Sequence, residues 1–128
     1  MTRPAEYSIL VVDDNPLVLK LGRALVEKEG YRAYTAGTWI ELNREIAEQK
    51  PNLILMDVNM PVMKGNRLSE LLKSKSGTQK IPIVLMSDLP EASLQQMFVT
   101  SGADAWIRKP LTKDKILNLV SRFPPAEP

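Results

Sequence analysis

The sequence reads LILMDVNMP at residues 53–61, an apolar run that ends in an aspartate, Asp57, and then turns. Near-continuous runs of Leu, Ile and Val are typical of parallel strands that are covered on both faces of a sheet. A second such run, ILVVDDN at residues 9–15, ends in Asp13 and Asp14. Three carboxylates therefore follow two runs of strand type, and this placement needs a chemical reason.

Apolar runs of strand length alternate with segments of helical period along the chain. The five runs lie at residues 8–12, 32–35, 53–56, 81–86 and 105–108. Between the first two, Asn15 and Pro16 supply a helix N-cap and a proline at the first helical position, and Gly30 suits a left-handed position after the helix. The alternation predicts an α/β fold with a doubly wound parallel sheet and right-handed crossovers.

Each predicted helix places apolar residues on one face and ends at a residue that stops helical propagation. The first helix has its apolar face at Leu17, Val18, Leu21 and Leu25. The last has its apolar face at Ile116, Leu117, Val120 and Phe123. The second spans about residues 40–49, and the third and fourth are expected to end at Gly77 and Gly102.

The composition predicts one compact domain, because the chain has 128 residues of which 44% are hydrophobic and 25% are charged. We expect a core at about residues 8–123, with residues 124–128 as a tail or the start of a linker. The chain has no cysteine, which excludes disulfides and thiolate metal sites, and no histidine, which removes the commonest general base and the usual zinc ligand.

The charge and hydropathy exclude several classes of partner. A formal net charge of +2 is too small to indicate direct binding to nucleic acid. No apolar run approaches the roughly 20 residues that a membrane span needs, and the N-terminus has no signal-peptide pattern. We therefore expect a soluble, cytoplasmic protein with no membrane contact.

Polar residues whose side chains can bind a ligand or react lie at the ends of the predicted strands. In a doubly wound sheet, ligands bind beyond these ends. The polar residues are Asp13, Asp14, Asp57, Ser87 and Lys109. Carboxylates about 4 Å apart would repel by roughly 4 kcal/mol per pair at an effective dielectric of 20, so a cation is expected among them. Lys109 supplies one positive charge, and ligands that are all oxygen favour Mg²⁺ for the rest.

One of these acids is also a candidate nucleophile. An aspartate can attack phosphorus and form an acyl phosphate. The transferred group needs its charge neutralised and its oxygens held, which a metal, a lysine ammonium and a serine hydroxyl from adjacent strands would do. Asp57 is the best-placed acceptor because it lies on a different strand from the pair Asp13 and Asp14.

Four motifs in this order and spacing resemble a response-regulator receiver domain of two-component signalling, similar to the chemotaxis receiver. They are ILVVDDNP, LILMDVNMPVMKG, IPIVLMS and GADAWIRKP. The resemblance runs from about residue 8 to residue 123. It implies a flavodoxin-like, five-stranded parallel sheet in the order 2-1-3-4-5 with helices on both faces.

The resemblance also implies a phosphoryl acceptor and a metal site. Asp57 would accept a phosphoryl group from the phosphohistidine of a sensor histidine kinase or a phosphotransfer protein. Asp14 and Asp57 would bind Mg²⁺ directly, Asp13 would assist through water, and Asn59 would add its backbone carbonyl.

The remaining site residues follow from the same resemblance. Ser87 and Lys109 would hold the phosphoryl oxygens, and the peptide bond before Pro110 would be cis. The added charge would switch the face made by the fourth helix, the fifth strand and the fifth helix, which would then control an output domain or protein.

The chain departs from the family pattern at a few positions. Trp106 stands where the family usually has the switching Tyr or Phe, and a larger indole whose N–H needs a partner would restrict the usual movement. Asp88 replaces a small residue. Leu89 and Asn59 occupy positions that tune the lifetime of the acyl phosphate, and Leu89 favours slow self-dephosphorylation. Lys64 stands where an acid is frequent.

Simpler interpretations of single residues stay open. Asp14 could only favour the N-terminus of the helix that begins at Pro16. Ser87 and Asp88 could cap the helix that begins near Pro90, and for Asp88 we expect this role.

Two other functions stay open as well. A phosphorylation-independent interaction module has its support in Trp106 and Asp88. An aspartate-nucleophile phosphatase of the haloacid dehalogenase type ranks last, because the chain reads DDNP and not DxDxT, so we expect no enzyme proper. Homodimerisation through the fourth and fifth helices, dependent on phosphorylation, is left open.

Overall fold

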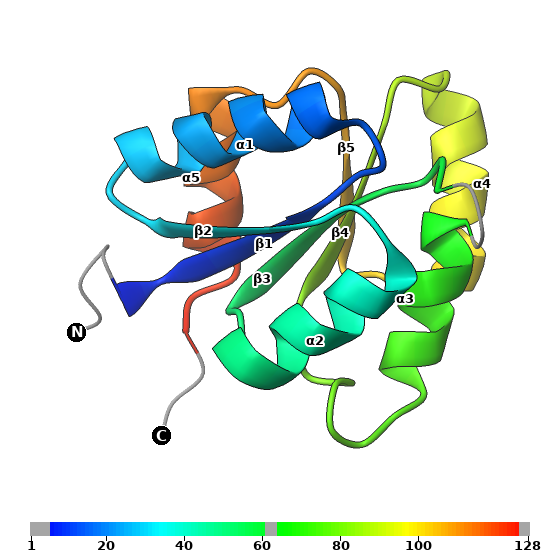
Figure 1. The fold of residues 1–128 in the computed structure, drawn as a ribbon. Coiled ribbons are helices and arrows are strands. Elements are labelled where there is room, and N and C mark those ends of the chain that lie inside the picture. The colour runs from blue at the N-terminus through cyan, green and yellow to red at the C-terminus, as the bar shows by residue number, and fades with distance from the viewer. Residues whose placement is uncertain (1–5, 61–63, 126–128) are drawn as a thin grey trace.

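The computed structural model describes residues 6–60 and 64–125 of the chain, in which strands and helices alternate (Figure 1). The strands are β1 (Ser8–Val12), β2 (Arg32–Ala36), β3 (Leu53–Asp57), β4 (Ile83–Ser87) and β5 (Ala105–Arg108). The helices are α1 (Pro16–Lys28), α2 (Trp39–Gln49), α3 (Gly65–Lys73), α4 (Glu91–Ser101) and α5 (Lys113–Arg122). Within this part of the chain, no helix is both long enough and apolar enough to cross a membrane.

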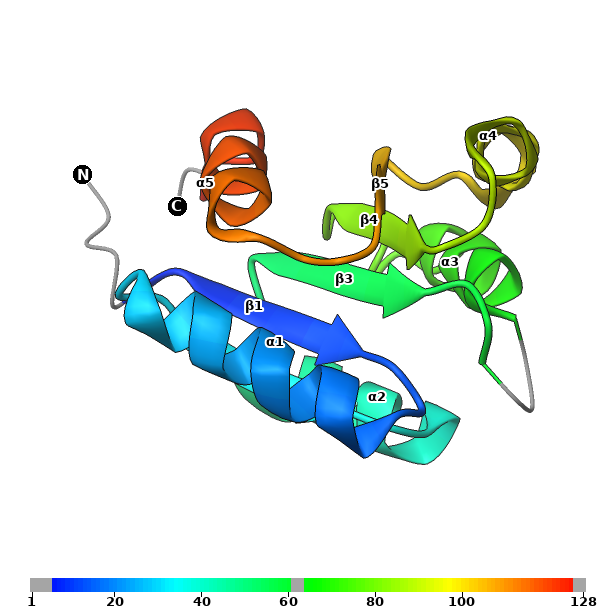
Figure 2. The same ribbon diagram turned by 90° about the horizontal axis from the view of Figure 1, so that it is seen from above.

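The sheet is parallel throughout, in the order β2-β1-β3-β4-β5. This confirms the predicted doubly wound α/β fold and its strand order. The arrowheads of β1, β3 and β4 point the same way in Figure 2. The register sets Asp57 opposite Met86 and Ser87 opposite Arg108, so the polar strand ends lie along one edge of the sheet.

Helices cover both faces of the sheet because alternate strand residues point to opposite sides. Leu10 and Val12 of β1 pack into the core cluster that includes residues of α2, α3 and α4. Ile9 and Val11 of the same strand pack into a second cluster with α1 and α5. Figure 2 looks onto the second face, where β1 and β3 run between α1 and α5. Strands buried on both faces explain the near-continuous apolar runs.

The residues that begin α1 and that end α1 and α4 are those that the sequence predicted. Asn15 caps α1, because its side-chain oxygen accepts the Leu17 N–H at 2.9 Å. Gly30 and Gly102 have φ values of 92° and 73°, in the left-handed region that only glycine adopts at little cost. The predicted ends of the first and fourth helices are therefore confirmed.

The predicted end of the third helix at Gly77 is wrong, since α3 ends at Lys73. The hydroxyl of Ser74 donates to the Leu71 carbonyl at 2.6 Å, and that of Thr78 donates to the Leu72 carbonyl. Short polar side chains that bond the backbone in this way compete with helical hydrogen bonds. Serine and threonine, and not the glycine, therefore stop this helix.

Tyr7 joins the start of β1 to the end of α5, and Tyr7→Phe is expected to lower the free energy of unfolding by about 1 kcal/mol. The Tyr7 hydroxyl donates to the Phe123 carbonyl at 2.6 Å, and the side chain is 2% exposed. Burial, with a smaller contribution from Tyr31, raises the pKa of Tyr7 from 10.0 to about 12. Because the folded pKa is the higher one, the stability that Tyr7 contributes is complete below pH 10.0 and is lost as the pH rises through about 12.

Urea unfolding at neutral pH and over this alkaline range measures both effects. Tyr7→Phe should lack the alkaline loss that the wild type shows. Tyr34→Phe is the matched control, because no hydrogen bond of the Tyr34 hydroxyl is found among the described residues and its side chain is only half-buried. Equal alkaline profiles for the wild type and Tyr7→Phe would contradict the prediction.

Candidate functional site

The ends of β1 and β3 bring three carboxylates together. Asp13 and Asp14 follow β1, and Asp57 is the last residue of β3. One oxygen of each lies within 4.8 Å of the others. Asp13 and Asp57 are buried, at 1% and 3% exposure, whereas Asp14 is exposed. The cluster therefore has two acids in the floor of the site and one at its mouth.

Lys109 extends from the residue after β5 to the two buried acids. Its ammonium lies 2.8 Å from Asp13 Oδ2 and 3.3 Å from Asp57 Oδ1. Its backbone N–H donates to the Ser87 carbonyl at 2.8 Å, which continues the pairing of β4 with β5 beyond the strand and fixes the start of the side chain. Lys109 thus supplies one positive charge against three carboxylates.

The electrostatics of the site show that the negative charge is not fully compensated. Burial raises the pKa of Asp57 above its usual range, the charge of Asp13 raises it further, and Lys109 offsets part of both effects. Burial acts to lower the pKa of Lys109, but its hydrogen bond to Asp13 and the charges of Asp57 and Asp13 outweigh this and raise it. Lys109 therefore stays charged, and the negative charge that it does not compensate favours the binding of a further cation.

Ser87 and Asn59 adjoin the acids from β4 and from the loop after β3. The Ser87 side chain is fully buried, and its Oγ accepts the Leu89 N–H at 3.0 Å. Among the hydrogen bonds of the described residues, this hydroxyl accepts and does not donate. The backbone N–H of Asn59 donates to the Asp57 carboxylate, and Asn59 is exposed.

Trp106 lies on β5, three residues before Lys109, and Pro110 follows Lys109 directly in the sequence. The Trp106 indole N–H donates to Gln95 Oε1 of α4 at 2.8 Å. The sequence indicated that this N–H needs a partner but not which residue supplies it, because Gln95 lies on another element. The Lys109–Pro110 peptide bond is cis.

The simpler role considered for Asp88 finds no support, and that of Asp14 stays a prediction. The N-cap of α4 is Pro90 and no side chain caps this helix, so the expected capping role of Asp88 is wrong. Asp88 is exposed, and the contact found for it is its carbonyl 3.5 Å from the Arg108 guanidinium. Asp14 directly precedes Asn15, the N-cap of α1, so its charge lies near the N-terminus of that helix.

The donor set fits a hard divalent cation. The converging ligands are carboxylate oxygens, with no sulfur or imidazole in the sequence beyond methionine thioethers. Mg²⁺ favours one or two carboxylates, with water and substrate oxygens in the other positions. The exposed Asp14 leaves the site open to solvent, as such coordination requires. The acidic cluster can therefore bind a metal ion.

Comparison with known proteins agrees with this geometry. The family model described as the response regulator receiver domain matches residues 9–121. The polar-differentiation response regulator DivK of Brucella anthropi is 27% identical over 116 residues, which cover 91% of this chain and 94% of the relative.

Solved structures show the same likeness. The chemotaxis protein CheY4 of Vibrio cholerae is 25% identical with a TM-score of 0.82, over 91% of this chain and 98% of that one. The receiver domain of a signal transduction histidine kinase from Syntrophus aciditrophicus is 29% identical with a TM-score of 0.81, over 91% and 89%. The match of the family model to most of the chain, joined to the acidic pocket and the strand order, shows that this protein belongs to the response regulator receiver domain family.

Proposed function

We propose that the protein is a phosphoacceptor that takes a phosphoryl group onto Asp57 from the phosphohistidine of a sensor histidine kinase or phosphotransfer protein. A carboxylate oxygen of Asp57 attacks phosphorus, a P–O bond forms, and the P–N bond breaks with its electron pair returning to the imidazole. The observation that carries the proposal is the buried Asp57 carboxylate beside both Asp13 and Lys109. An aspartate carboxylate can act as a nucleophile and form a covalent aspartyl phosphate.

The residues around Asp57 support the transfer. The Lys109 ammonium, 3.3 Å from Asp57 Oδ1, lies where it can meet a phosphoryl oxygen. The Ser87 hydroxyl can donate its proton to a second phosphoryl oxygen, because its own oxygen is the acceptor in the hydrogen bond with the Leu89 N–H. Preorganised donors of this kind stabilise charge that develops during transfer.

Mg²⁺ is the proposed cofactor, and when bound it would neutralise charge on the phosphoryl oxygens and the acids. Asp14 and Asp57 would hold it directly and Asn59 through its carbonyl. Asp13 would act through water, because its Oδ1 already accepts the Asn15 N–H at 2.9 Å and its Oδ2 accepts Lys109 at 2.8 Å.

The proposed output is a change at the face made by α4, β5 and α5. Phosphorylation replaces the Asp57 carboxylate by an acyl phosphate that carries roughly −1.5 to −2 charges, and this change would bias a two-state equilibrium there. Trp106 on β5 is bonded to Gln95 on α4, so movement of the indole would break a defined contact between the two elements. The altered face would control an output domain or protein, with homodimerisation as one form of output.

Incubation with acetyl phosphate tests the proposal. With Mg²⁺ present, the wild type is expected to gain the mass of one phosphoryl group, and fragmentation should place it on Asp57. Without Mg²⁺ and with EDTA, the gain should be lost, because the charge that opposes transfer is then not neutralised. Intact-mass spectrometry measures both, and a repeat with a histidine kinase's phosphorylated domain tests the donor.

Two outcomes would reject the proposal. Modification at a residue other than Asp57 would remove its central assignment. Lack of any gain from either donor, in protein that binds Mg²⁺, would favour the phosphorylation-independent interaction module instead.

A further inference from the structure

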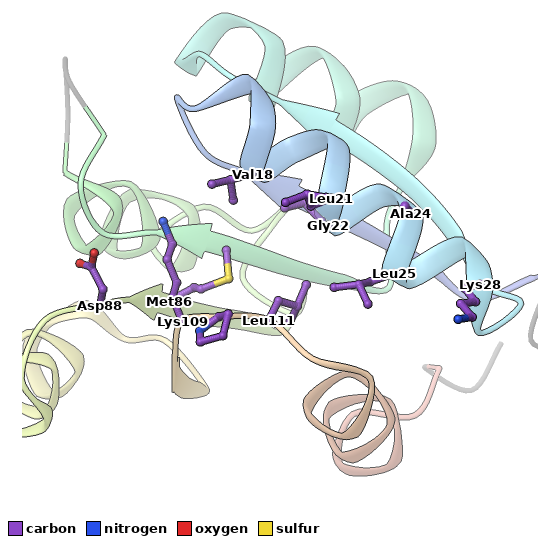
Figure 3. Close-up of a pocket in the computed structure, with 12 residues that line it drawn as sticks. Val18, Leu21, Gly22, Ala24, Leu25, Lys28, Met86, Asp88, Lys109 and Leu111 are labelled. Carbon is purple, nitrogen blue, oxygen red and sulfur yellow. The ribbon is translucent and has the colours of Figure 1, made fainter.

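A cavity of about 660 Å³ lies between α1 and the segment that follows β5. Leu21, Gly22 and Leu25 of α1 form one wall, and Met86 and Leu111 lie across from them (Figure 3). The lining is mainly apolar side chains with a few charged ones at its ends. This volume and lining are those of small-molecule sites, which run from about 300 to 1,000 Å³.

Gly22 is a buried residue of α1 that lines this cavity. Glycine inside a helix costs about 1 kcal/mol relative to alanine, so its presence there needs a reason. Gly22 does not have a positive φ, so its backbone conformation is open to other residues. A Cβ at Gly22 would meet Val11 Cγ1 at 3.4 Å and Leu111 Cδ2 at 3.9 Å, which are ordinary contacts. Neither a positive φ nor a clash requires glycine, and without a side chain at this position the cavity is lined by Val11 and Leu111 beside it.

The cavity also exposes apolar surface that an occupant would cover. Leu21 lines it and is 56% exposed, and Leu17, one turn earlier on α1, is 60% exposed. The first helix was predicted to bury both, but α1 instead buries Gly22 and Val26 against the sheet. Contiguous exposed apolar surface beside a cavity is typical of a binding site.

The charges at the two ends of the cavity differ. Asp88 and Lys109 lie at one end, and Lys28, in the last turn of α1, lies at the other (Figure 3). The Lys109 ammonium is already held by Asp13 and Asp57. Lys28 is exposed and takes part in none of the ion pairs found among the described residues. The cation available to an occupant is therefore at the end away from Asp57.

We propose that this cavity binds a small apolar monoanion, with its apolar body between Leu21 and Leu111 and its anionic group paired with Lys28. The cavity adjoins the acidic cluster at Lys109, but Lys28 lies at its other end, and the test uses unphosphorylated protein. The result therefore stands independently of phosphoryl transfer to Asp57.

Anilinonaphthalene sulfonate, a fluorescent apolar anion, is the probe. The folded wild type is expected to bind it saturably at one site. Decanoate should displace it, and decyltrimethylammonium, with the same chain and the opposite charge, should not at equal concentration. Displacement by both with equal strength would overturn the assignment of an anion.

Three variants locate the site. Gly22→Leu, which places a side chain between Val11 and Leu111, should weaken probe binding at least tenfold while circular dichroism and the urea midpoint show a folded protein. Lys28→Gln should weaken it by up to about 5-fold, the value of a partly exposed ion pair. Lys20→Gln, an exposed lysine of the same helix, is the matched control and should leave it unchanged.

Contrary results are equally clear. Unchanged probe binding in folded Gly22→Leu would overturn the proposal, as would binding that does not saturate. If Gly22→Leu fails to fold, the comparison of Lys28→Gln with Lys20→Gln decides, and equal affinity in these two would overturn it.

Discussion

Asp57→Asn is expected to abolish phosphorylation and, without Mg²⁺, to make the fold more stable than the wild type. The amide has no anionic oxygen to attack phosphorus, so the phosphoryl gain should be lost completely. The amide also keeps the shape of the carboxylate without its charge. Burial first and the Asp13 charge second raise the pKa of Asp57, which means that the ionised group is held at a cost that Lys109 does not fully offset.

The pH dependence follows from the direction of this shift. Because the folded pKa of Asp57 lies above the usual 3.8, protonation favours the fold. The contribution of Asp57 is complete below pH 3.8 and is lost as the pH rises through the folded pKa. Asp57→Asn should not show this loss, so its advantage in urea midpoint should grow as the pH rises towards neutral.

The control for Asp57→Asn is Asp114→Asn, the same chemical change at an exposed carboxylate of α5. This variant should be phosphorylated like the wild type and should keep the wild-type pH profile. A lower urea midpoint for Asp57→Asn at neutral pH in EDTA would show that its pairing with Lys109 outweighs the cost of burial.

The strands were predictable because burial on both faces leaves a local signal. The predicted runs at residues 8–12 and 105–108 coincide with β1 and β5, and those at residues 32–35 and 53–56 end one residue before β2 and β3 do. The run at residues 81–86 begins two residues before β4 does and ends one residue before it does. The order of the strands could not come from these runs. It was implied by the family motifs, and the observed order agrees.

Helix faces were harder to predict, because periodicity identifies an apolar stripe but not the angle at which a helix docks. In α5, Leu117 was expected inside but is 38% exposed, while Leu119, which was not singled out, is 1% exposed. In α1, Gly22 replaces the expected leucines against Val11. A residue without a side chain carries no hydrophobic signal, so the pattern of apolar residues could not identify Gly22 as buried.

The sequence predicted that the acidic residues cluster, but it did not predict the individual contacts between side chains. Parallel strand ends meet at one edge, so Asp13, Asp14 and Asp57 had to lie near one another, and the structure brings them together. The shorter contact of Lys109 with Asp13, and the bond from Trp106 to Gln95, depend on side-chain rotamers between distant elements. No local pattern encodes these.

Lys109→Met is expected to lower the free energy of unfolding in EDTA by about 3 kcal/mol, because removal of one partner leaves buried charges uncompensated. The ammonium is 2.8 Å from Asp13 and 3.3 Å from Asp57, and these two acids have side chains only 1% and 4% exposed. Methionine keeps much of the aliphatic chain, so the loss reports the charge. Urea unfolding at neutral pH measures it.

Lys20→Met is the matched control, since Lys20 is exposed on α1 and forms no ion pair among the described residues. It should change the free energy of unfolding by less than about 0.5 kcal/mol. A loss at Lys109 no larger than that of the control would show that water reaches the two acids and solvates them.

A double-mutant cycle separates charge compensation from packing at Lys109. In the wild type, Asp13→Asn weakens the shortest contact of the Lys109 ammonium and should destabilise the fold. In the Lys109→Met background, the same change removes one of two buried charges that repel each other and should stabilise it. The effect of Asp13→Asn therefore changes sign with residue 109 only if the two side chains interact through charge. The same sign in both backgrounds would mean that Lys109 contributes to stability through its aliphatic chain, and that the acids are compensated by solvent.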